Sequence, residues 1–285
     1  MNRDDQSIHR LLSSPSPHMI GRIAGIELKV AYFVLEHAHK IRDQDLLELE
    51  NNAGIHITSQ ESLKEYSTRL IEAYEACSAI GTWETSGKVY EITGEGQNFV
   101  QRRTPHIPKI SALALEPYYL SPMEPSWMEA LKGKRVLILH PFIHTIHKQL
   151  EHLKELYPNR SWFEGCQFRL VRPPFTLAGN HNNKDWKEHY EECITTLRKT
   201  YEEEPFDIAL IGAGGYGMLL SHFLYSEFRV STVYIGGALQ IFFGVIGKRW
   251  FTNKKIMELV NDSWTRPLIE DKPSEFQRVE RGCYW

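Results

Sequence analysis

Two glycine-rich segments in the second half of the sequence could bind a phosphate. Gly212, Gly214 and Gly217 match the spacing G-x-G-x-x-G and directly follow an apolar run of strand length, residues 206–211. Glycines let the backbone turn tightly and approach a phosphate, and a following helix supplies free N–H groups and a positive dipole end. A second apolar run, residues 229–235, also ends in glycines. We expect the ligand to contact Gly212, Gly214, Gly215, Tyr216, Gly217, Gly236 and Gly237.

A missing carboxylate narrows the choice of ligand. A dinucleotide-binding motif of this kind carries an acidic residue about twenty positions further on, where it holds the ribose hydroxyls. Here the second apolar run ends in Tyr234 and Ile235, with no carboxylate. This disfavours NAD and leaves a phosphate or a sugar nucleotide as the expected ligand. The alternative is that the glycines only allow a strand and a helix to pack closely.

A basic and aromatic cluster follows the second pair of glycines. Lys248 and Arg249 stand beside Trp250, and Gln240 lies between the glycines and this cluster. Two adjacent cations beside a tryptophan could pair with a diphosphate and stack on a base or a sugar. The alternative is a solvated helix end whose cations interact with the negative end of the helix dipole. Because the cluster follows the glycines so closely, we favour the ligand.

The segment of residues 21–27 places Arg22 and Glu27 around a glycine-rich turn after a short apolar run. Arginine binds anions through two parallel hydrogen bonds, and a glutamate in the same loop could be a metal ligand or a base. Equally, Glu27 could interact favourably with the dipole at the start of a helix while Arg22 lies on the surface. Taken alone, this segment favours the second alternative.

Histidine and amide side chains follow two further strand-like runs. His140 ends the run of residues 134–139, at the edge where α/β sheets place their ligands. His144 and His147 are one helical turn apart, but no further ligand lies close in the sequence, so we do not expect zinc there. The loop after residues 168–171 contains Thr176, Asn180 and His181. Their side chains could form hydrogen bonds with sugar hydroxyls or phosphates, or they could cap the next helix.

The elements that position these residues follow from hydrophobic periodicity. From residue 134 onward, strand-like and helix-like runs alternate as β-α-β-α-β-α-β, which predicts a Rossmann-like α/β fold with a mostly parallel sheet flanked by helices. The expected order is strand 134–139, helix 143–156, strand 168–171, helix 184–203, strand 206–211, helix 218–228 and strand 229–235.

The first half adds a short strand at residues 19–23 and helical stretches at residues 26–39 and 60–80, the latter with Ser59 as N-cap. We expect a loop at residues 94–108. We treat residues 1–285 as a single domain. Its outer parts are a loose lead-in, residues 1–18, and an irregular C-terminal tail, residues 261–285, which wraps the surface and whose aromatic residues pack or close a sugar site.

Composition gives weaker limits. A net charge of −3 offers no argument for nucleic acid or an anionic membrane as the main partner. The four cysteines are widely scattered, which favours a reducing compartment, and the first residues lack the pattern of a signal peptide, so we expect a cytoplasmic protein. Residues 230–247 carry no charge, but their glycines and polar residues fit a buried core better than a transmembrane segment.

Four segments together resemble bacterial and viral proteins of surface-polysaccharide synthesis related to the GT-D-fold glycosyltransferases. These segments are residues 20–27, 136–149, 210–217 and 236–250. The resemblance implies a GT-D-like fold and transfer of a sugar from a nucleotide-sugar donor, a UDP-sugar being one option, to a glycan acceptor. In the characterised enzymes an acidic D-x-E pair holds a divalent metal such as Mn²⁺ or Mg²⁺ on the donor diphosphate.

The sequence departs from that pattern at one position. It keeps Arg22 and Glu27 but has Gly25 where the family carries the aspartate. Either the metal is held differently, or the diphosphate charge is met by Arg22, Lys248, Arg249 and helix N-termini, or the protein is an inactive relative.

We therefore expect a glycosyltransferase in which Glu27 is the metal ligand or base, and Arg22 and the Lys248–Arg249 pair stabilise the leaving diphosphate. His140, Asn180 and Gln240 would orient the sugar or the acceptor. The alternatives are a nucleotide- or NAD-dependent oxidoreductase and a non-catalytic protein that binds a nucleotide or a sugar.

Overall fold

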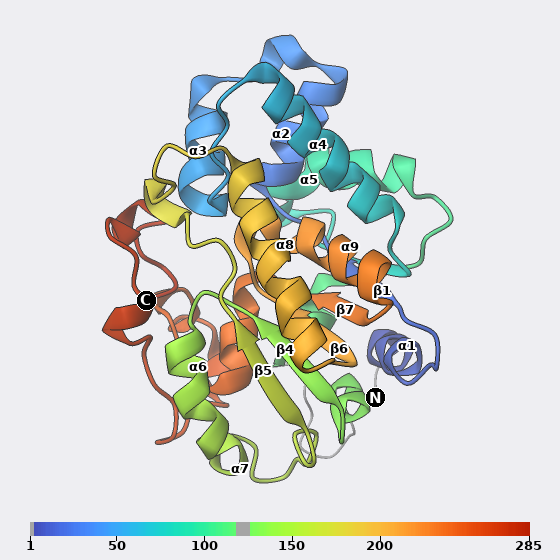
Figure 1. The fold of residues 1–285 in the computed structure, drawn as a ribbon, viewed down its shortest axis with the longest axis vertical. Helices are drawn as coiled ribbons and strands as arrows, with labels where there is room; N and C mark the ends of the chain where they lie inside the picture. Colours follow the sequence, from blue (N-terminus) through green and yellow to red (C-terminus); the bar gives the residue numbers. More distant parts are fainter. Residues whose placement is uncertain (1–2, 118–125) are drawn as a thin grey trace.

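The computed structural model describes residues 3–117 and 126–285 and places all its named strands in one parallel sheet (Figure 1). The strands run in the order β3-β2-β1-β7-β6-β4-β5. Their bounds are β1 (Met19–Arg22), β2 (Ala79–Thr82), β3 (Lys109–Ser111), β4 (Arg135–Leu139), β5 (Gln167–Val171), β6 (Ile208–Ile211) and β7 (Ser231–Tyr234). The predicted α/β fold with a parallel sheet flanked by helices is confirmed, as is the alternation of strands and helices after residue 134.

The central strands are apolar on both faces because helices cover both sides of the sheet. In β4, Leu137 and Leu139 face one core, while Val136 and Ile138 face the other. Such continuous apolar runs are what a parallel sheet buried on both faces requires. The sheet edge at the carboxyl ends of these strands is therefore where polar side chains can gather.

One face of the sheet is covered by helices from both halves of the chain. They are α2 (Ile26–Glu36), α3 (Asp43–Ala53), α4 (Gln60–Glu75), α5 (Gly87–Arg103), α8 (Trp186–Glu203) and α9 (Gly217–Phe228). Figure 1 shows α8 and α9 across the front of the strands and α2 to α5 gathered above them. Ser59 is the N-cap of α4 as predicted, and its side chain accepts a hydrogen bond from the Ser62 N–H (3.1 Å).

The other face is covered by α1 (Arg3–Leu12), α6 (Ile143–Gln149), α7 (Leu153–Leu156), several 3₁₀ helices and the C-terminal tail. The largest of these 3₁₀ helices is η8 (Gly236–Phe243), which is buried along most of its length. The predicted helix of residues 143–156 is interrupted by a 3₁₀ turn between α6 and α7. No helix of the described residues is long and apolar enough to cross a membrane.

Two predicted irregular segments are wrong. The lead-in contains α1, whose Ile8 and Leu12 are buried and whose Asp5 accepts a hydrogen bond from the Trp127 N–H (3.0 Å). The predicted loop at residues 94–108 begins inside α5. A Cβ atom at Gly96 would lie 2.5 Å from Leu28 Cβ, so this glycine lets α5 pack closely on α2 rather than ending the helix.

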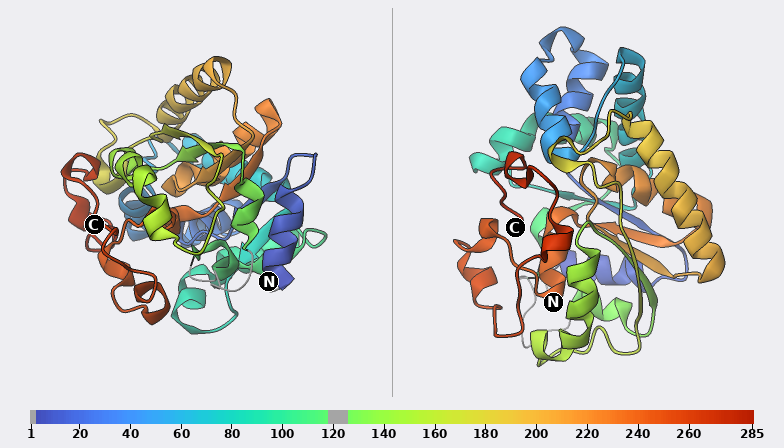
Figure 2. Two further views of the ribbon diagram at one scale, coloured as in Figure 1. Left: turned by 90° about the horizontal axis from the view of Figure 1, so that it is seen from below. Right: turned by 60° about the vertical axis from the view of Figure 1, so that its left-hand side comes forward.

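The tail is irregular, as predicted, but it does not lie only on the surface. Asp271, Val279 and Trp285 are buried. The Asp271 carboxylate accepts hydrogen bonds from the N–H and the hydroxyl of Thr145 on α6, both 2.6 Å long. In the right-hand view of Figure 2, the red tail runs alongside green α6. The tail is thus bound to the main body through buried contacts.

Candidate functional site

The sheet order brings the predicted segments together at one edge. Strands β1, β7, β6 and β4 are consecutive neighbours, and each ends in a segment predicted to bind ligand. These are residues 22–27 after β1, residues 235–237 after β7, residues 212–217 after β6 and residues 140–142 after β4. Because parallel strands place their carboxyl ends at one edge, four distant segments become neighbours there.

A small cavity lies at this edge. Its volume is about 50 Å³. Its lining includes the predicted Gly212, Gly214, Gly237, His140 and Gln240, together with Asn52, Pro141, Phe142, Leu177, Tyr284 and Trp285. The predicted residues on this list belong to three different loops, and the last two residues of the tail complete the wall. We call this the carboxyl-edge cavity.

Two glycines of the cavity wall have no room for a side chain. A Cβ atom at Gly212 would lie 2.7 Å from Gly236 O and 2.8 Å from His140 Cδ2. A Cβ atom at Gly237 would lie 2.3 Å from the ring of Tyr284. The close approach at Gly237 involves the tail, so this glycine provides the space in which Tyr284 lies.

Other residues of the G-x-G-x-x-G motif serve packing. A Cβ atom at Gly217 would lie 2.1 Å from the Tyr234 ring, and one at Gly215 would lie 2.4 Å from Ile55 Cγ1. Tyr216 is buried in the core beneath the loop. These three, like Gly236, are not among the residues that line the carboxyl-edge cavity. The close-packing alternative therefore describes Gly215 and Gly217 well.

His140 is a neutral hydrogen-bond donor in this site. Its Nδ1 accepts a hydrogen bond from the Phe142 N–H (3.0 Å), which leaves the ring proton on Nε2. Burial lowers the pKa of His140 to about 3, so the imidazole is uncharged at neutral pH. With its proton on Nε2, the ring can donate to a phosphate or sugar oxygen, but it is not poised to accept a proton there.

Gln240 contributes an unpaired acceptor. Its Nε2 donates to Val245 O (3.0 Å) and Tyr284 O (3.2 Å), whereas its Oε1 is buried without a hydrogen-bond partner. A buried polar atom left unpaired costs about 1–3 kcal/mol. A ligand hydroxyl or N–H group that reached this oxygen would remove that cost.

Arg22 is buried and already paired. Its guanidinium forms an ion pair with Glu116, donates to Ile235 O (2.5 Å) and lies 4.5 Å from the centre of the Trp83 ring. Only its Nε has no partner. Thus Arg22 is not the surface arginine of the alternative interpretation, and its charge is balanced in this structure. No motif marks Glu116, so nothing in the sequence pattern indicated this ion pair.

Arg249 is held by the tail. Its Nη1 donates to the Tyr284 hydroxyl (2.5 Å) and lies 3.9 Å from the Glu280 carboxylate. Its guanidinium also lies 4.9 Å from the centre of the Tyr284 ring. The pKa of Arg249 is raised by the nearby Tyr284, Glu280 and Cys283. The neighbouring Lys248 is exposed. The tail therefore already binds Arg249, the cation that was expected to bind a diphosphate.

Glu27 lies at the start of α2 and is buried. Burial raises its pKa; hydrogen bonds from the backbone at Glu27 and Gly25 act in the opposite direction, and the charge of Glu280 raises it further. Two buried tyrosines close to this carboxylate hold the neighbouring glycine loop: Tyr66 donates to Gly215 O (3.0 Å) and Tyr234 donates to Gly214 O (3.2 Å). No pattern in the sequence indicated either contact.

Among the described residues, no three-ligand metal site includes Glu27. The residues whose ligand atoms lie close enough together to hold an ion are Glu50, His56 and His181. Its hydrogen bonds argue against a metal. His181 Nδ1 accepts from the Asn183 N–H (3.0 Å), so the ring proton is on Nε2, 3.5 Å from Glu50 Oε1. A metal needs an unprotonated nitrogen. The two imidazole rings are also stacked 3.6 Å apart at 6°, so one ion could not lie in both ring planes.

Asn180 has a structural role. Its Nδ2 donates to Leu177 O (2.7 Å) and Ser274 O (2.9 Å), and its Oδ1 accepts from the Ser274 hydroxyl. The side chain thus fastens the tail to the loop before α8 and is not among the residues lining the carboxyl-edge cavity. The prediction that it orients a sugar gains no support from this placement.

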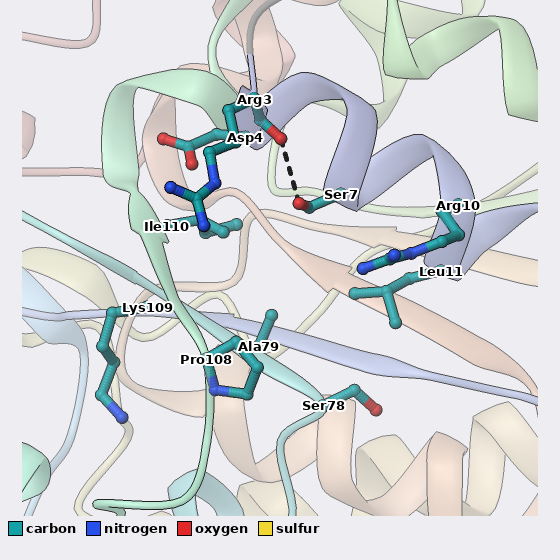
Figure 3. A pocket seen from close by; sticks show the side chains of 10 residues that line it. All are labelled: Arg3, Asp4, Ser7, Arg10, Leu11, Ser78, Ala79, Pro108, Lys109 and Ile110. Carbon is teal, nitrogen blue, oxygen red and sulfur yellow. Dashed lines mark hydrogen bonds between the residues drawn. The ribbon is translucent and has the colours of Figure 1, made fainter.

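A larger cavity of about 430 Å³ lies at the opposite edge, between α1 and the starts of β2 and β3 (Figure 3). Its cations are Arg3, Arg10 and Lys109. The Lys109 ammonium donates to Thr104 O and Ile107 O (both 2.6 Å), so it is already bonded to the backbone. The cavity contains none of the predicted site residues, and it lies at the amino ends of strands, where α/β sheets do not usually bind ligands.

Comparison with known proteins gives no independent assignment. No protein-family model matches the sequence, and no curated protein matches it.

Proposed function

We propose that the protein is a glycosyltransferase that uses a nucleotide diphosphate-sugar donor and binds it at the carboxyl-edge cavity. The observation that carries the proposal is the lining of this cavity. Gly212, Gly214 and Gly237 provide backbone, His140 provides an uncharged N–H donor, and Gln240 provides an unpaired acceptor. A sugar diphosphate needs this combination, because its hydroxyl groups donate hydrogen bonds and its phosphate oxygens accept them.

In this proposal, cations behind the cavity wall stabilise the leaving diphosphate once the cavity has opened. Arg22 lies behind the loop after β7, and Arg249 lies behind Tyr284. Lys248, the sequence neighbour of Arg249, is exposed. Glu27 would be the ligand of a divalent metal if one were used. Because the described residues give Glu27 no partner set for an ion, we assign the charge of the diphosphate to these cations.

The cavity must widen to accept a donor. Small-molecule sites usually measure about 300–1,000 Å³, so the cavity of about 50 Å³ cannot hold a nucleotide sugar. Tyr284 is the side chain to displace, because its ring fills the space beside Gly237 and its hydroxyl accepts a hydrogen bond from Arg249. Its movement would enlarge the cavity and free the Arg249 guanidinium for the diphosphate.

The test is a panel of nucleotide sugars, each with and without manganese, assayed for release of free nucleotide and for a rise in melting temperature. We expect at least one donor to be hydrolysed or transferred and to stabilise the fold. If no donor is turned over and none raises the melting temperature, the proposal fails. Binding without turnover would instead favour the non-catalytic alternative, which Gly25 at the expected aspartate position already supports.

A matched pair of arginine variants tests the site. Arg249→Ala should weaken donor binding about tenfold to a hundredfold, since a hydrogen bond to a charged group contributes about 1.5–3 kcal/mol. Arg102→Ala is the control, because Arg102 also lies near an aromatic ring and pairs with a glutamate, but does so on α5. Equal donor affinity in the two variants would remove Arg249 from the site.

The oxidoreductase alternative remains weaker. Strand β7 ends in Tyr234, whose hydroxyl is bound to Gly214 O, so no carboxylate stands where a ribose would be held. Tight binding of NAD(H) or NADP(H) would revive it. We also propose a cytoplasmic location, since all four cysteines are free thiols.

A further inference from the structure

Exposed apolar side chains lie among cations on the chain that follows the carboxyl-edge cavity. Phe251 is 49% exposed and Met257 is 38% exposed. Lys248 precedes Phe251 in the sequence, Lys254 lies between Phe251 and Met257, and both lysines are exposed. The Arg266 guanidinium lies 5.0 Å from the centre of the Phe251 ring. We call these five residues the basic-apolar surface. In the right-hand view of Figure 2, the orange-red chain of this region forms an outer side of the molecule.

The fold fixes the outward direction of these side chains. Trp250 and Ile256, which alternate with them in the sequence, are buried in the core. The Asn253 side chain caps the short helix α10 (Lys254–Met257) by accepting a hydrogen bond from the Ile256 N–H (3.3 Å). With the turns anchored in this way, Phe251 and Met257 cannot both turn inward without removing a buried side chain.

The charge of this segment is opposite to that of the whole chain. Residues 248–266 include five lysines and arginines against two carboxylates, Glu258 and Asp262, whereas the chain carries a net charge of −3. One of the five, Arg249, is paired with Glu280, and the lysines are exposed. Cations that flank a protruding aromatic side chain complement a surface that is anionic outside and apolar beneath.

We propose that the basic-apolar surface binds peripherally to an anionic lipid bilayer. Phe251 and Met257 would enter the boundary between headgroups and acyl chains, and Lys248, Lys254 and Arg266 would lie at the lipid phosphates. This mode of binding needs no membrane-spanning helix. It does not depend on the proposed glycosyl transfer, because the ligand is a lipid surface and only Lys248 of the five residues also belongs to the proposed donor site.

The experiment is co-sedimentation of the full chain with vesicles of phosphatidylcholine alone and of phosphatidylcholine with phosphatidylglycerol. We expect binding to the mixed vesicles only, with a steep loss as salt is raised. Lys248→Glu and Lys254→Glu should each lower the partition coefficient at least about fivefold, the effect of one basic residue near an anionic surface. Phe251→Ser should lower it at every salt concentration, because it removes apolar contact rather than charge.

Two matched controls separate this surface from a general effect of charge or hydrophobicity. Leu47→Ser removes an apolar side chain that is 50% exposed on α3, and Lys64→Glu reverses an exposed lysine on α4. Both should bind vesicles like the wild type. The proposal is overturned if the wild-type protein does not bind the mixed vesicles, or if the controls lose as much binding as the surface variants. Circular dichroism checks that each variant is folded.

Discussion

Replacing His140 by asparagine should remove part of the acid sensitivity of the fold. The buried imidazole has its pKa lowered to about 3. In the unfolded chain the pKa of the same group is about 6.5. The unfolded state therefore binds more protons between these values, so His140 gives its full stability above about pH 6.5 and loses it as the pH falls toward 3.

The size of the effect follows from the two pKa values. Stability falls by about 1.4 kcal/mol per pH unit within this window, which amounts to about 2 kcal/mol between about pH 7 and pH 5. The asparagine Oδ1 can still accept the Phe142 N–H that now donates to His140 Nδ1. The variant thus keeps the local hydrogen bond but has no group to titrate.

Urea unfolding at a series of pH values measures this prediction. The difference in stability between wild type and His140→Asn should shrink by about 2 kcal/mol from about pH 7 to pH 5. His147→Asn is the matched control, because His147 is exposed on α6. The stability difference between wild type and His147→Asn should show no such trend. If wild type and His140→Asn have parallel pH profiles, the imidazole is not held neutral by burial and its proposed role as an Nε2–H donor is wrong.

The remaining predictions concern the loops, the buried ion pair and the tail. Gly217→Ala should destabilise the fold by about 1–3 kcal/mol in thermal or urea unfolding, since its Cβ would collide with the Tyr234 ring; an unchanged stability would contradict the packing role. Glu116→Ala should cost about 3–5 kcal/mol by leaving the buried Arg22 charge unpaired, and a smaller loss would mean that water reaches the guanidinium. Tyr284→Ala should raise the affinity for a nucleoside diphosphate, measured by calorimetry, if the tail competes for the site; unchanged or weaker binding would show that it does not.

The sequence was sufficient for the part of the site that depends on strand ends. Gly212, Gly237 and His140 each follow a buried apolar run, and parallel strands necessarily bring such positions to one edge. The missed contacts join positions far apart in the chain without any periodic pattern. Arg22 pairs with a glutamate 94 residues away, and the Tyr66 hydroxyl reaches a carbonyl 149 residues away.

The mistaken helix boundaries have a different cause. Glycines in residues 94–96 resemble a loop, because glycine is unfavourable inside a helix. Here Gly96 is needed where α5 touches Leu28 on α2, so tertiary packing outweighs local propensity. The same holds for α1, a short polar segment that would be marginal alone but is held by buried Ile8 and Leu12.

The most consequential contact that the sequence did not predict is between the tail and the proposed donor site. The Tyr284 hydroxyl accepts a hydrogen bond from the Arg249 guanidinium, and the Tyr284 backbone carbonyl accepts one from the Gln240 amide. A diphosphate and a sugar could make equivalent bonds to these two groups, so ligand and tail compete for the same partners. The affinity of the whole protein must then be lower than that of the open site by the fraction of molecules that are open. An apparently weak donor affinity would therefore measure the closed tail as well as the quality of the site.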